Sequence, residues 1–184
     1  MNHRPLVFID LETTGASTRD SRVLEIGAIR VEKLKVVDTF SSLIKVDDPI
    51  PPFITGLTGI DTTMTKNSPR FADIADRLSA FMDGAIFVAH NVGFDYSFMQ
   101  LEYRNLNQKF SMDKLCTVRL SRSFYPGQRR HNLDTIITTH GFKVDNRHRA
   151  LDDAQVLVDF FNKIIDENGI QTFAVMNKLV RYAR

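Results

Sequence analysis

The chain of 184 residues is 43% hydrophobic and 25% charged, and its formal net charge at pH 7 is +2. This composition is typical of a soluble globular protein of one domain, and no window approaches the roughly 18 consecutive apolar residues of a membrane span. The small positive charge permits a nucleic-acid partner without arguing for one. Cys116 is the single cysteine, which excludes an intramolecular disulfide, and the apolar run Leu6–Ile9 is too short for a signal peptide. We therefore expect a cytoplasmic protein without a membrane partner.

The first segments of the chain have the pattern of β-strands. The run Leu6–Ile9 is continuously apolar, as expected of a strand that is covered on both faces. The segment Val23–Val31 is rich in β-branched residues and is interrupted mainly by Glu25 and Gly27. The segment Val36–Val46 is more polar and alternates weakly, which suits an outer strand. These segments predict three strands.

A proline-rich loop separates these strands from the rest of the chain. Three prolines in DDPIPPFITGLTGID, residues 47–61, are expected to preclude a regular helix or a central strand at its start. Apolar residues at helical spacing predict a helix over about 69–82, and AIFVAHN predicts a fourth strand. Further helices are expected over about 95–106, 117–124, 132–140, 150–167 and 170–182, with Gly141 and Gly169 as C-caps. Strands followed by helices, with a strand–helix crossover, predict an α/β or α+β layered domain.

Two carboxylates follow the first apolar run. Side chains two positions apart on a strand share a face, so Asp10 and Glu12 would lie side by side if the strand continues through them. Adjacent carboxylates near a core repel and lose solvation, and a cation between them would offset both costs. Alternatively, the strand ends at Asp10 and both residues cap a loop. Asp95 in HNVGFD is either the N-cap of the next helix or a third carboxylate at a strand end, where open α/β sheets place their sites.

The segment HRALDDAQVLVDFF supplies a fourth carboxylate. On a helical wheel of about 100° per residue, Ala154 and Leu157 lie on the buried stripe and Asp152 lies on the solvent face. Asp153 falls on the apolar side, where a carboxylate should be paired or should coordinate a metal. His148 precedes the helix, either close enough to share a site with Asp153 or as an exposed loop histidine. Oxygen ligands without cysteine or paired histidines favour Mg²⁺ or Mn²⁺ over Zn²⁺.

The segments FIDLETTG, HNVGFD and HRALDDA, in this order, resemble the three exonuclease motifs of the DEDD superfamily. The H-x-A-x-x-D form of the third motif resembles the DEDDh branch, and the likeness is greatest to the proofreading epsilon type of bacterial DNA polymerase III. The resemblance extends over roughly residues 5–165 and includes LEIGAIRV and LSRSFYPGQRRHNLDTI. It implies an RNase H-like exonuclease fold, with a mixed β-sheet flanked by α-helices, in a single exonuclease domain over residues 1–184.

The resemblance also implies a chemistry. A metal-dependent 3′→5′ exonuclease would hydrolyse phosphodiester bonds at the 3′ ends of single-stranded or frayed DNA, and would release nucleoside 5′-monophosphates in proofreading or repair. It would use two divalent cations, Mg²⁺ or Mn²⁺. Asp10 would bridge both cations, and Glu12 and Asp153 would hold the one that carries the attacking water. Asp95 would hold the second cation, and His148 would be the general base.

The resemblance further implies a substrate pocket and contacts along the nucleic acid. The pocket residues would be Leu11, Thr13, Thr14, Gly15, Thr58, His90, Asn91 and Phe94. Leu11 and Phe94 suit core packing equally well, and Thr58 departs from the histidine of the epsilon type. A basic group lies either along the single-strand path or on a solvated surface; its members are Arg119, Arg122, Arg129, Arg130 and His131. Arg147 and Arg149 would either lower the pKa of His148 or contact the substrate backbone.

Two other functions stay open beside the DNA exonuclease. One is a 3′→5′ exoribonuclease that trims RNA ends, and the other is a non-catalytic nucleic-acid-binding or scaffold module. Competent residue types at all five motif positions disfavour the scaffold. A DNA polymerase, or another domain of a larger polypeptide, is an implied partner.

Overall fold

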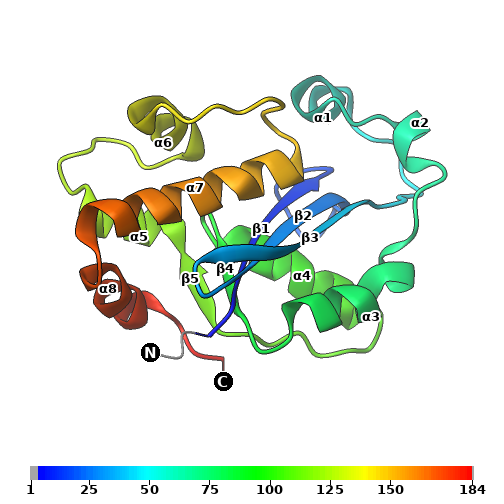
Figure 1. Cartoon of the computed structure of the whole chain (residues 1–184). Coiled ribbons are helices and arrows are strands. Elements are labelled where there is room, and N and C mark those ends of the chain that lie inside the picture. Colours follow the sequence, from blue (N-terminus) through cyan, green and yellow to red (C-terminus); the bar gives the residue numbers. More distant parts are fainter. Residues whose placement is uncertain (1–3, 184) are drawn as a thin grey trace.

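A five-stranded mixed sheet lies between two layers of helices in the computed structural model, which describes residues 4–183 (Figure 1). The strand order is β3-β2-β1-β4-β5. Strands β1 (Leu6–Thr13), β2 (Val23–Glu32) and β3 (Lys35–Leu43) form an antiparallel half of the sheet. Strands β4 (Ile86–Ala89) and β5 (Lys114–Cys116) extend it in parallel from the other side of β1. The layered architecture predicted from the element order is confirmed, as a mixed sheet flanked by helices.

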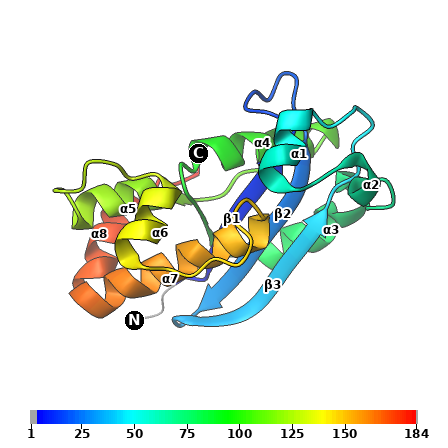
Figure 2. The same ribbon diagram turned by 90° about the horizontal axis from the view of Figure 1, so that it is seen from above.

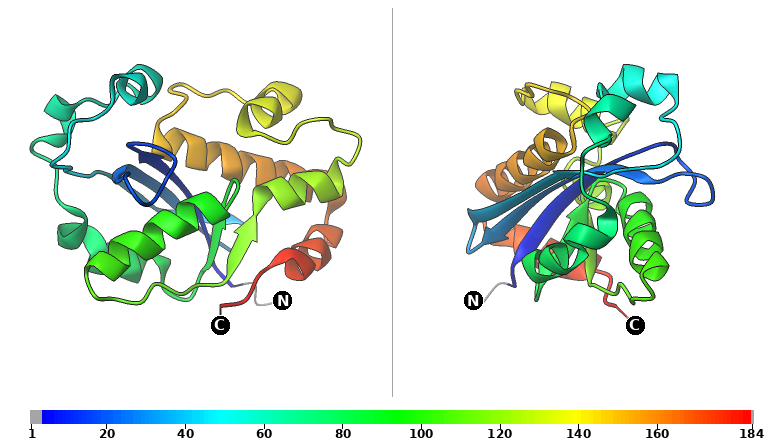
Figure 3. Two further views of the ribbon diagram at one scale, coloured as in Figure 1. Left: turned by 180° about the vertical axis from the view of Figure 1, so that it is seen from behind. Right: turned by 90° about the vertical axis from the view of Figure 1, so that its right-hand side faces the viewer.

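Helices cover both faces of the sheet. They are α1 (Pro52–Thr58), α2 (Thr62–Thr65), α3 (Phe71–Met82), α4 (Gly93–Asn105), α5 (Thr117–Phe124), α6 (Leu133–His140), α7 (Ala150–Asn168) and α8 (Gln171–Leu179). Alternate residues of β1 face opposite layers: Val7 and Ile9 pack with α3 and α4, whereas Leu6 and Phe8 pack with α5 to α8 (Figure 3). Among the described helices, none is long and apolar enough to cross a membrane.

The proline-rich segment contains a helix, so the prediction of a loop there was wrong. Helix α1 begins at Pro52, directly after Pro51. Proline is excluded from a helix interior, but in the first turn its missing N–H has no intrahelical partner to lose. The helix ends at Gly59, whose φ of 72° is left-handed. A single further turn, α2, is capped by the Asp61 side chain, which accepts the N–H of Met64 at 2.8 Å.

The end of the chain also differs from the prediction. Helix α8 stops at Leu179, three residues before the predicted end, because the next residues pair with the sheet edge. The backbone of Arg181 exchanges two hydrogen bonds with Lys114, at 2.8 and 2.9 Å, which requires an extended chain. Strand β5 itself was not predicted, because three residues carry little periodicity. The predicted C-caps Gly141 and Gly169 are confirmed.

Candidate active site

Strand β1 extends beyond its neighbour β4, and this exposes the edge where the carboxylates gather. β4 pairs with β1 only over Leu6–Phe8, whereas β2 pairs with it as far as Thr13. Asp95 lies in the first turn of α4 rather than at its N-cap, and its carboxyl group hydrogen-bonds to the backbone of Leu11. Burial raises the pKa of Asp95 to about 8. Helix α4 therefore brings a buried carboxyl group to β1, beyond the end of β4.

Asp10 and Glu12 both lie within β1 and share one face, so neither residue caps a loop. Their side chains are partly exposed, whereas the alternate residues Leu11 and Thr13 are buried. Burial, followed by repulsion from Asp95 and other carboxylates, raises the pKa of Asp10 well above its usual range. Burial, followed by repulsion from Asp153, raises the pKa of Glu12 to about 8. Each carboxyl group makes ionisation of its neighbour less favourable.

Helix α7 supplies the remaining carboxylate. Asp153 is 2% exposed and Asp152 is partly exposed, in agreement with the helical phase. Oδ2 of Asp153 pairs with Arg147, while Oδ1 is buried and has no hydrogen-bond partner within residues 4–183. Burial raises the pKa of Asp153 to about 6, although Arg147 opposes the shift. One potential ligand atom from each of Glu12, His148 and Asp153 lies within 4.8 Å of the others.

Two residues of β2 hold α7 against the sheet, and neither was identified from the sequence. Glu25 is buried, accepts three hydrogen bonds from Arg149 at 2.7–3.2 Å, and accepts the Ala150 N–H at 2.9 Å. Gly27 lies opposite Asp10, and a Cβ there would be 2.1 Å from the backbone of Ala150. Helix α7 consequently lies directly across β1 and β2 (Figure 2). The available signal was a glutamate and a glycine within the mainly apolar first part of β2.

The two arginines beside His148 have different partners. Arg149 pairs with buried Glu25, whereas Arg147 pairs with Asp153 and, at 2.9 Å, with Asp134 of α6. Burial and then repulsion from Arg147 lower the pKa of His148 below its ordinary value. The sequence left open whether these arginines lower the pKa of His148 or contact the substrate backbone. In the structure, Arg147 lowers that pKa.

The residues of the expected pocket in the first motif have partners within the protein. Leu11 belongs to the core between the sheet and α3 and α4. Thr13 donates to the carbonyl oxygen of Gly15 at 2.7 Å, and Thr14 accepts the Arg22 N–H at 2.9 Å. A Cβ on Gly15 would meet the Ser21 hydroxyl at 2.7 Å, so its close approach is to its own loop. These contacts fix the loop that follows β1.

The other expected pocket residues come from α1 and from the segment after β4. Thr58 is buried, and its hydroxyl donates to Ile54 and accepts from Ile60 within the end of α1. Phe94 is partly buried, with its ring 5.0 Å from that of Phe98. His90 Nδ1 lies 2.9 Å from the Thr117 hydroxyl, and burial lowers the pKa of His90 to about 4. Asn91 is exposed, with a left-handed φ of 61°.

The basic group is only partly available on the surface. Arg122, Arg129 and Arg130 are exposed. Arg119 donates to the carbonyl oxygen of Leu179 at 3.3 Å, and His131 Nδ1 lies 2.7 Å from the Ser121 hydroxyl. Three of the five residues are therefore exposed to solvent, while the other two have contacts within the protein.

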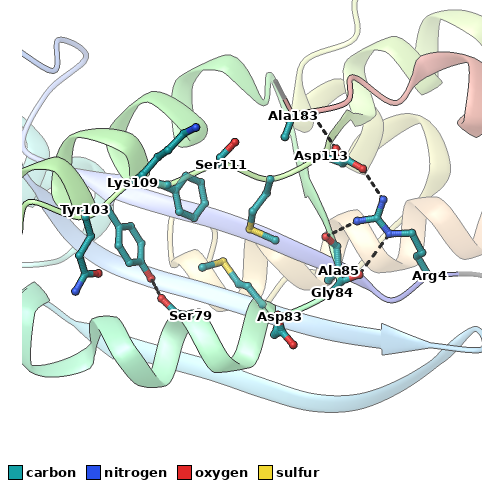
Figure 4. Close-up of a pocket in the computed structure, with 14 residues that line it drawn as sticks. Arg4, Ser79, Asp83, Gly84, Ala85, Tyr103, Lys109, Ser111, Asp113 and Ala183 are labelled. Atoms are coloured by element: carbon teal, nitrogen blue, oxygen red, sulfur yellow. Dashed lines mark hydrogen bonds and ion pairs between the residues drawn. The ribbon is translucent and has the colours of Figure 1, made fainter.

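A separate cavity of about 360 Å³ lies at the opposite end of β1 and contains none of these residues (Figure 4). At one side of it, Arg4 pairs with Asp113 and donates to the carbonyl oxygens of Gly84 and Ala85. The Ser79 and Tyr103 hydroxyl groups are 2.8 Å apart. Because these polar groups are paired with one another, the better candidate for an active site is the acidic cluster, formed by Asp10, Glu12, Asp95 and Asp153.

Comparisons with known proteins identify the family. The exonuclease (RNase_T) family model matches residues 7–161. The chain is 35% identical over 177 residues to a DNA polymerase III PolC-type of Caldanaerobacter subterraneus, which covers 95% of this chain and 13% of that protein. It is 33% identical over 178 residues to the DNA polymerase III subunit epsilon of Treponema pallidum, which covers 95% of this chain and 83% of that protein. Exonuclease X, solved in complex with 5′-overhanging duplex DNA, matches with a TM-score of 0.72 and 25% identity over 94% of this chain and 98% of that chain.

A mixed sheet lies between helices on both faces, and the match to Exonuclease X covers 94% of this chain; together they define the RNase H-like exonuclease fold. The chain belongs to the exonuclease family. The fold and the family predicted from the three motifs are confirmed, including the likeness to the epsilon type. The chain spans a small part, 13%, of the PolC-type relative.

Proposed function

We propose that residues 1–184 form one domain that acts as a metal-dependent 3′→5′ exonuclease on single-stranded or frayed DNA ends and releases nucleoside 5′-monophosphates. The observation that carries this proposal is the convergence of carboxylates from β1, α4 and α7, with the buried Oδ1 of Asp153 lacking a partner within residues 4–183. Exonuclease X, which shares the fold, was solved with DNA, and the two relatives are named DNA polymerase III PolC-type and DNA polymerase III subunit epsilon. These likenesses favour DNA as the substrate.

The donor set fits hard divalent cations, and we propose two of them, Mg²⁺ or Mn²⁺. Carboxylate oxygens are the preferred ligands of these ions, and a cation would compensate the repulsion that raises the carboxyl pKa values. Asp10 would contact both cations, Glu12 and Asp153 the first, and Asp95 the second. When bound, two cations supply activation of the attacking water and stabilisation of charge on the attacking and leaving oxygens.

The protein's own groups would orient the substrate and move one proton. His148, whose pKa is lowered by burial and by Arg147, is neutral near pH 7 and can accept the proton of the attacking water. The loop Thr13–Gly15, held by its internal hydrogen bonds, would meet the terminal nucleotide together with Asn91. The exposed arginines Arg122 and Arg130 would contact phosphates of the strand.

The cellular role would be proofreading or repair in the cytoplasm. A DNA polymerase, or another domain of a larger polypeptide, is the proposed partner, and the named relatives support this choice. The single free cysteine, Cys116, fits a reducing compartment.

The test is hydrolysis of single-stranded DNA and RNA of one sequence, labelled at the 5′ end, with Mg²⁺, with Mn²⁺ and with a chelator. We expect stepwise shortening of DNA from the 3′ end, nucleoside 5′-monophosphates as products, and no reaction with the chelator. Preference for RNA by more than about tenfold, or 1.4 kcal/mol of transition-state discrimination, would instead make the domain an exoribonuclease. Binding without hydrolysis in every condition would make it a scaffold.

A further inference from the structure

The acidic cluster contains a positive charge of its own, Arg147. Four carboxylates come together, and Arg147 is the cationic side chain that favours the ionised forms of Asp10, Glu12 and Asp153. Its side chain is 27% exposed, whereas that of Asp153 is 3% exposed. A carboxylate as buried as Asp153 needs a counter-ion, and Arg147 is the partner that it has.

One guanidinium nitrogen of Arg147 contacts two of the three residues that could share a cation. Its Nη1 donates to Oδ2 of Asp153 and lies 3.4 Å from Nδ1 of His148. Glu12 is the third residue of that group. With Arg147 on Oδ2, only Oδ1 of Asp153 is left for a divalent cation, and the two positive charges repel. A cation that takes both carboxylate oxygens, or Nδ1 of His148, therefore has to displace the guanidinium.

A second nitrogen of the Arg147 guanidinium binds a residue outside the acidic cluster. Nε of Arg147 donates to Oδ1 of Asp134 at 2.9 Å, and the Asp134 side chain is 63% exposed on α6. If Arg147 lost its contact with Asp153, it would therefore still be paired with Asp134. Its release from the acidic cluster would not leave an unpaired charge. Arg149, two residues away, has no such freedom because it is bound to the buried Glu25.

We propose that Arg147 is the resident cation of this site, which occupies Asp153 and His148 in the metal-free protein and which a divalent cation must displace. The inference rests on the proposed function, because it requires the cluster to bind metal. Arg147 then sets the metal affinity: its charge stabilises the ionised carboxylates and weakens binding of the incoming ion. Displacement also releases Nδ1 of His148 from its contact with the guanidinium.

The test is calorimetric measurement of Mn²⁺ binding to the whole chain, as wild type and as Arg147→Gln. We expect Arg147→Gln to bind Mn²⁺ about tenfold more tightly, since one competing charge is removed, and to melt at a lower temperature in chelator. Arg104→Gln is the control, because Arg104 is exposed on α4 and the charge change is the same. We expect its affinity for Mn²⁺ to equal that of the wild type.

Equal or weaker Mn²⁺ binding by Arg147→Gln would overturn the inference and leave the proposed function intact. A wild type that binds no Mn²⁺ would overturn both. If Arg147→Gln does not fold, the wild type itself is titrated with Mg²⁺ while the arginine Nε–H resonances are followed by NMR. The Arg147 resonance should then shift while that of Arg30, which is paired with Glu32, stays fixed; an unchanged Arg147 resonance would contradict displacement.

Discussion

Asp152 and Asp153 are adjacent and chemically identical, yet the protein places them in different surroundings. Asp153 is 2% exposed, faces Glu12 and His148, and keeps one oxygen without a partner in the described chain. Asp152 accepts a hydrogen bond from Asn146 at 3.0 Å at the surface. Because the helix turns by about 100° between them, the two residues should differ completely in function.

Replacement of each aspartate by asparagine tests this difference. We expect Asp153→Asn to lower kcat by about 100-fold or more, about 2.7 kcal/mol of transition-state stabilisation, because a charged cation ligand becomes neutral. We expect Asp152→Asn to stay within about twofold of the wild type, which corresponds to about 0.4 kcal/mol. The measurement is the rate of nucleotide release from single-stranded DNA at saturating Mg²⁺. Similar losses in both variants would contradict the assignment of Asp153.

At the scale of elements, the position of α7 on the sheet decides whether Asp153 and His148 reach β1. Gly27 allows the first turn of α7 to touch β2, and Glu25 binds the residues at its start. Both residues lie on β2, the strand beside β1. Gly27 is opposite Asp10, and Glu25 is opposite Glu12. The site therefore depends on one helix–sheet contact as much as on the carboxylates.

The close contact at Gly27 predicts a large effect of one methyl group. We expect Gly27→Ala to reduce the free energy of unfolding by about 3 kcal/mol, since the added carbon would overlap backbone that cannot rotate away. The matched control is Gly56→Ala in α1, where a Cβ would meet nothing within 4 Å and should stabilise the helix by about 0.5–1 kcal/mol. Urea unfolding of both variants measures the two changes. Equal stability of the variants would show that α7 is not seated on Gly27.

The anchoring of α7 by Glu25 predicts a loss of stability and of turnover together. In Glu25→Gln an amide NH₂ would face an N–H donor of Arg149 or Ala150, so we expect a loss of about 2–3 kcal/mol. The control is Glu32→Gln, whose partner Arg30 forms a more exposed ion pair worth about 0–1 kcal/mol. Thermal unfolding and nucleotide release are measured on both. Full activity in Glu25→Gln would rule out a positioning role.

Periodicity predicted the parts of the fold that depend on near neighbours. The phase of α7 and the shared face of Asp10 and Glu12 follow from repeats of 3.6 and 2 residues, and both are as expected. Glu25 and Arg147 were not assigned their partners, because those contacts join segments that only the folded chain brings together. The start of α1 was missed because proline was weighed as a helix breaker and not as a first-turn residue.

On the scale of the whole molecule, the carboxyl groups make stability depend on pH. The pKa values of Glu12 and Asp95 are raised to about 8 and that of Asp153 to about 6, all above their ordinary values near 4. The folded, metal-free protein therefore holds more protons than the unfolded chain between about pH 4 and pH 8, so its stability falls as pH rises through this window. A cation that binds the ionised carboxylates opposes that loss.

Because stability falls as pH rises, the effect of a bound metal ion on thermal stability should also depend on pH. We expect the rise in Tm caused by Mg²⁺, relative to chelator, to be small at pH 5 and to increase up to about pH 8, because ionised carboxylates become more crowded and more available to the ion. Thermal unfolding in matched buffers at four pH values measures the difference. A rise in Tm that is constant over this range, or largest at pH 5, would contradict a cation site built from these carboxylates.

Everything proposed for this chain depends on divalent cations binding where β1, α4 and α7 meet. The most direct measurement is the anomalous scattering of Mn²⁺ in crystals of the protein grown with that ion. We predict density for Mn²⁺ in contact with Asp10, Glu12 and Asp153, and no density there in crystals grown with chelator. Mn²⁺ bound elsewhere, with Arg147 still paired to Asp153, would contradict the proposed active site.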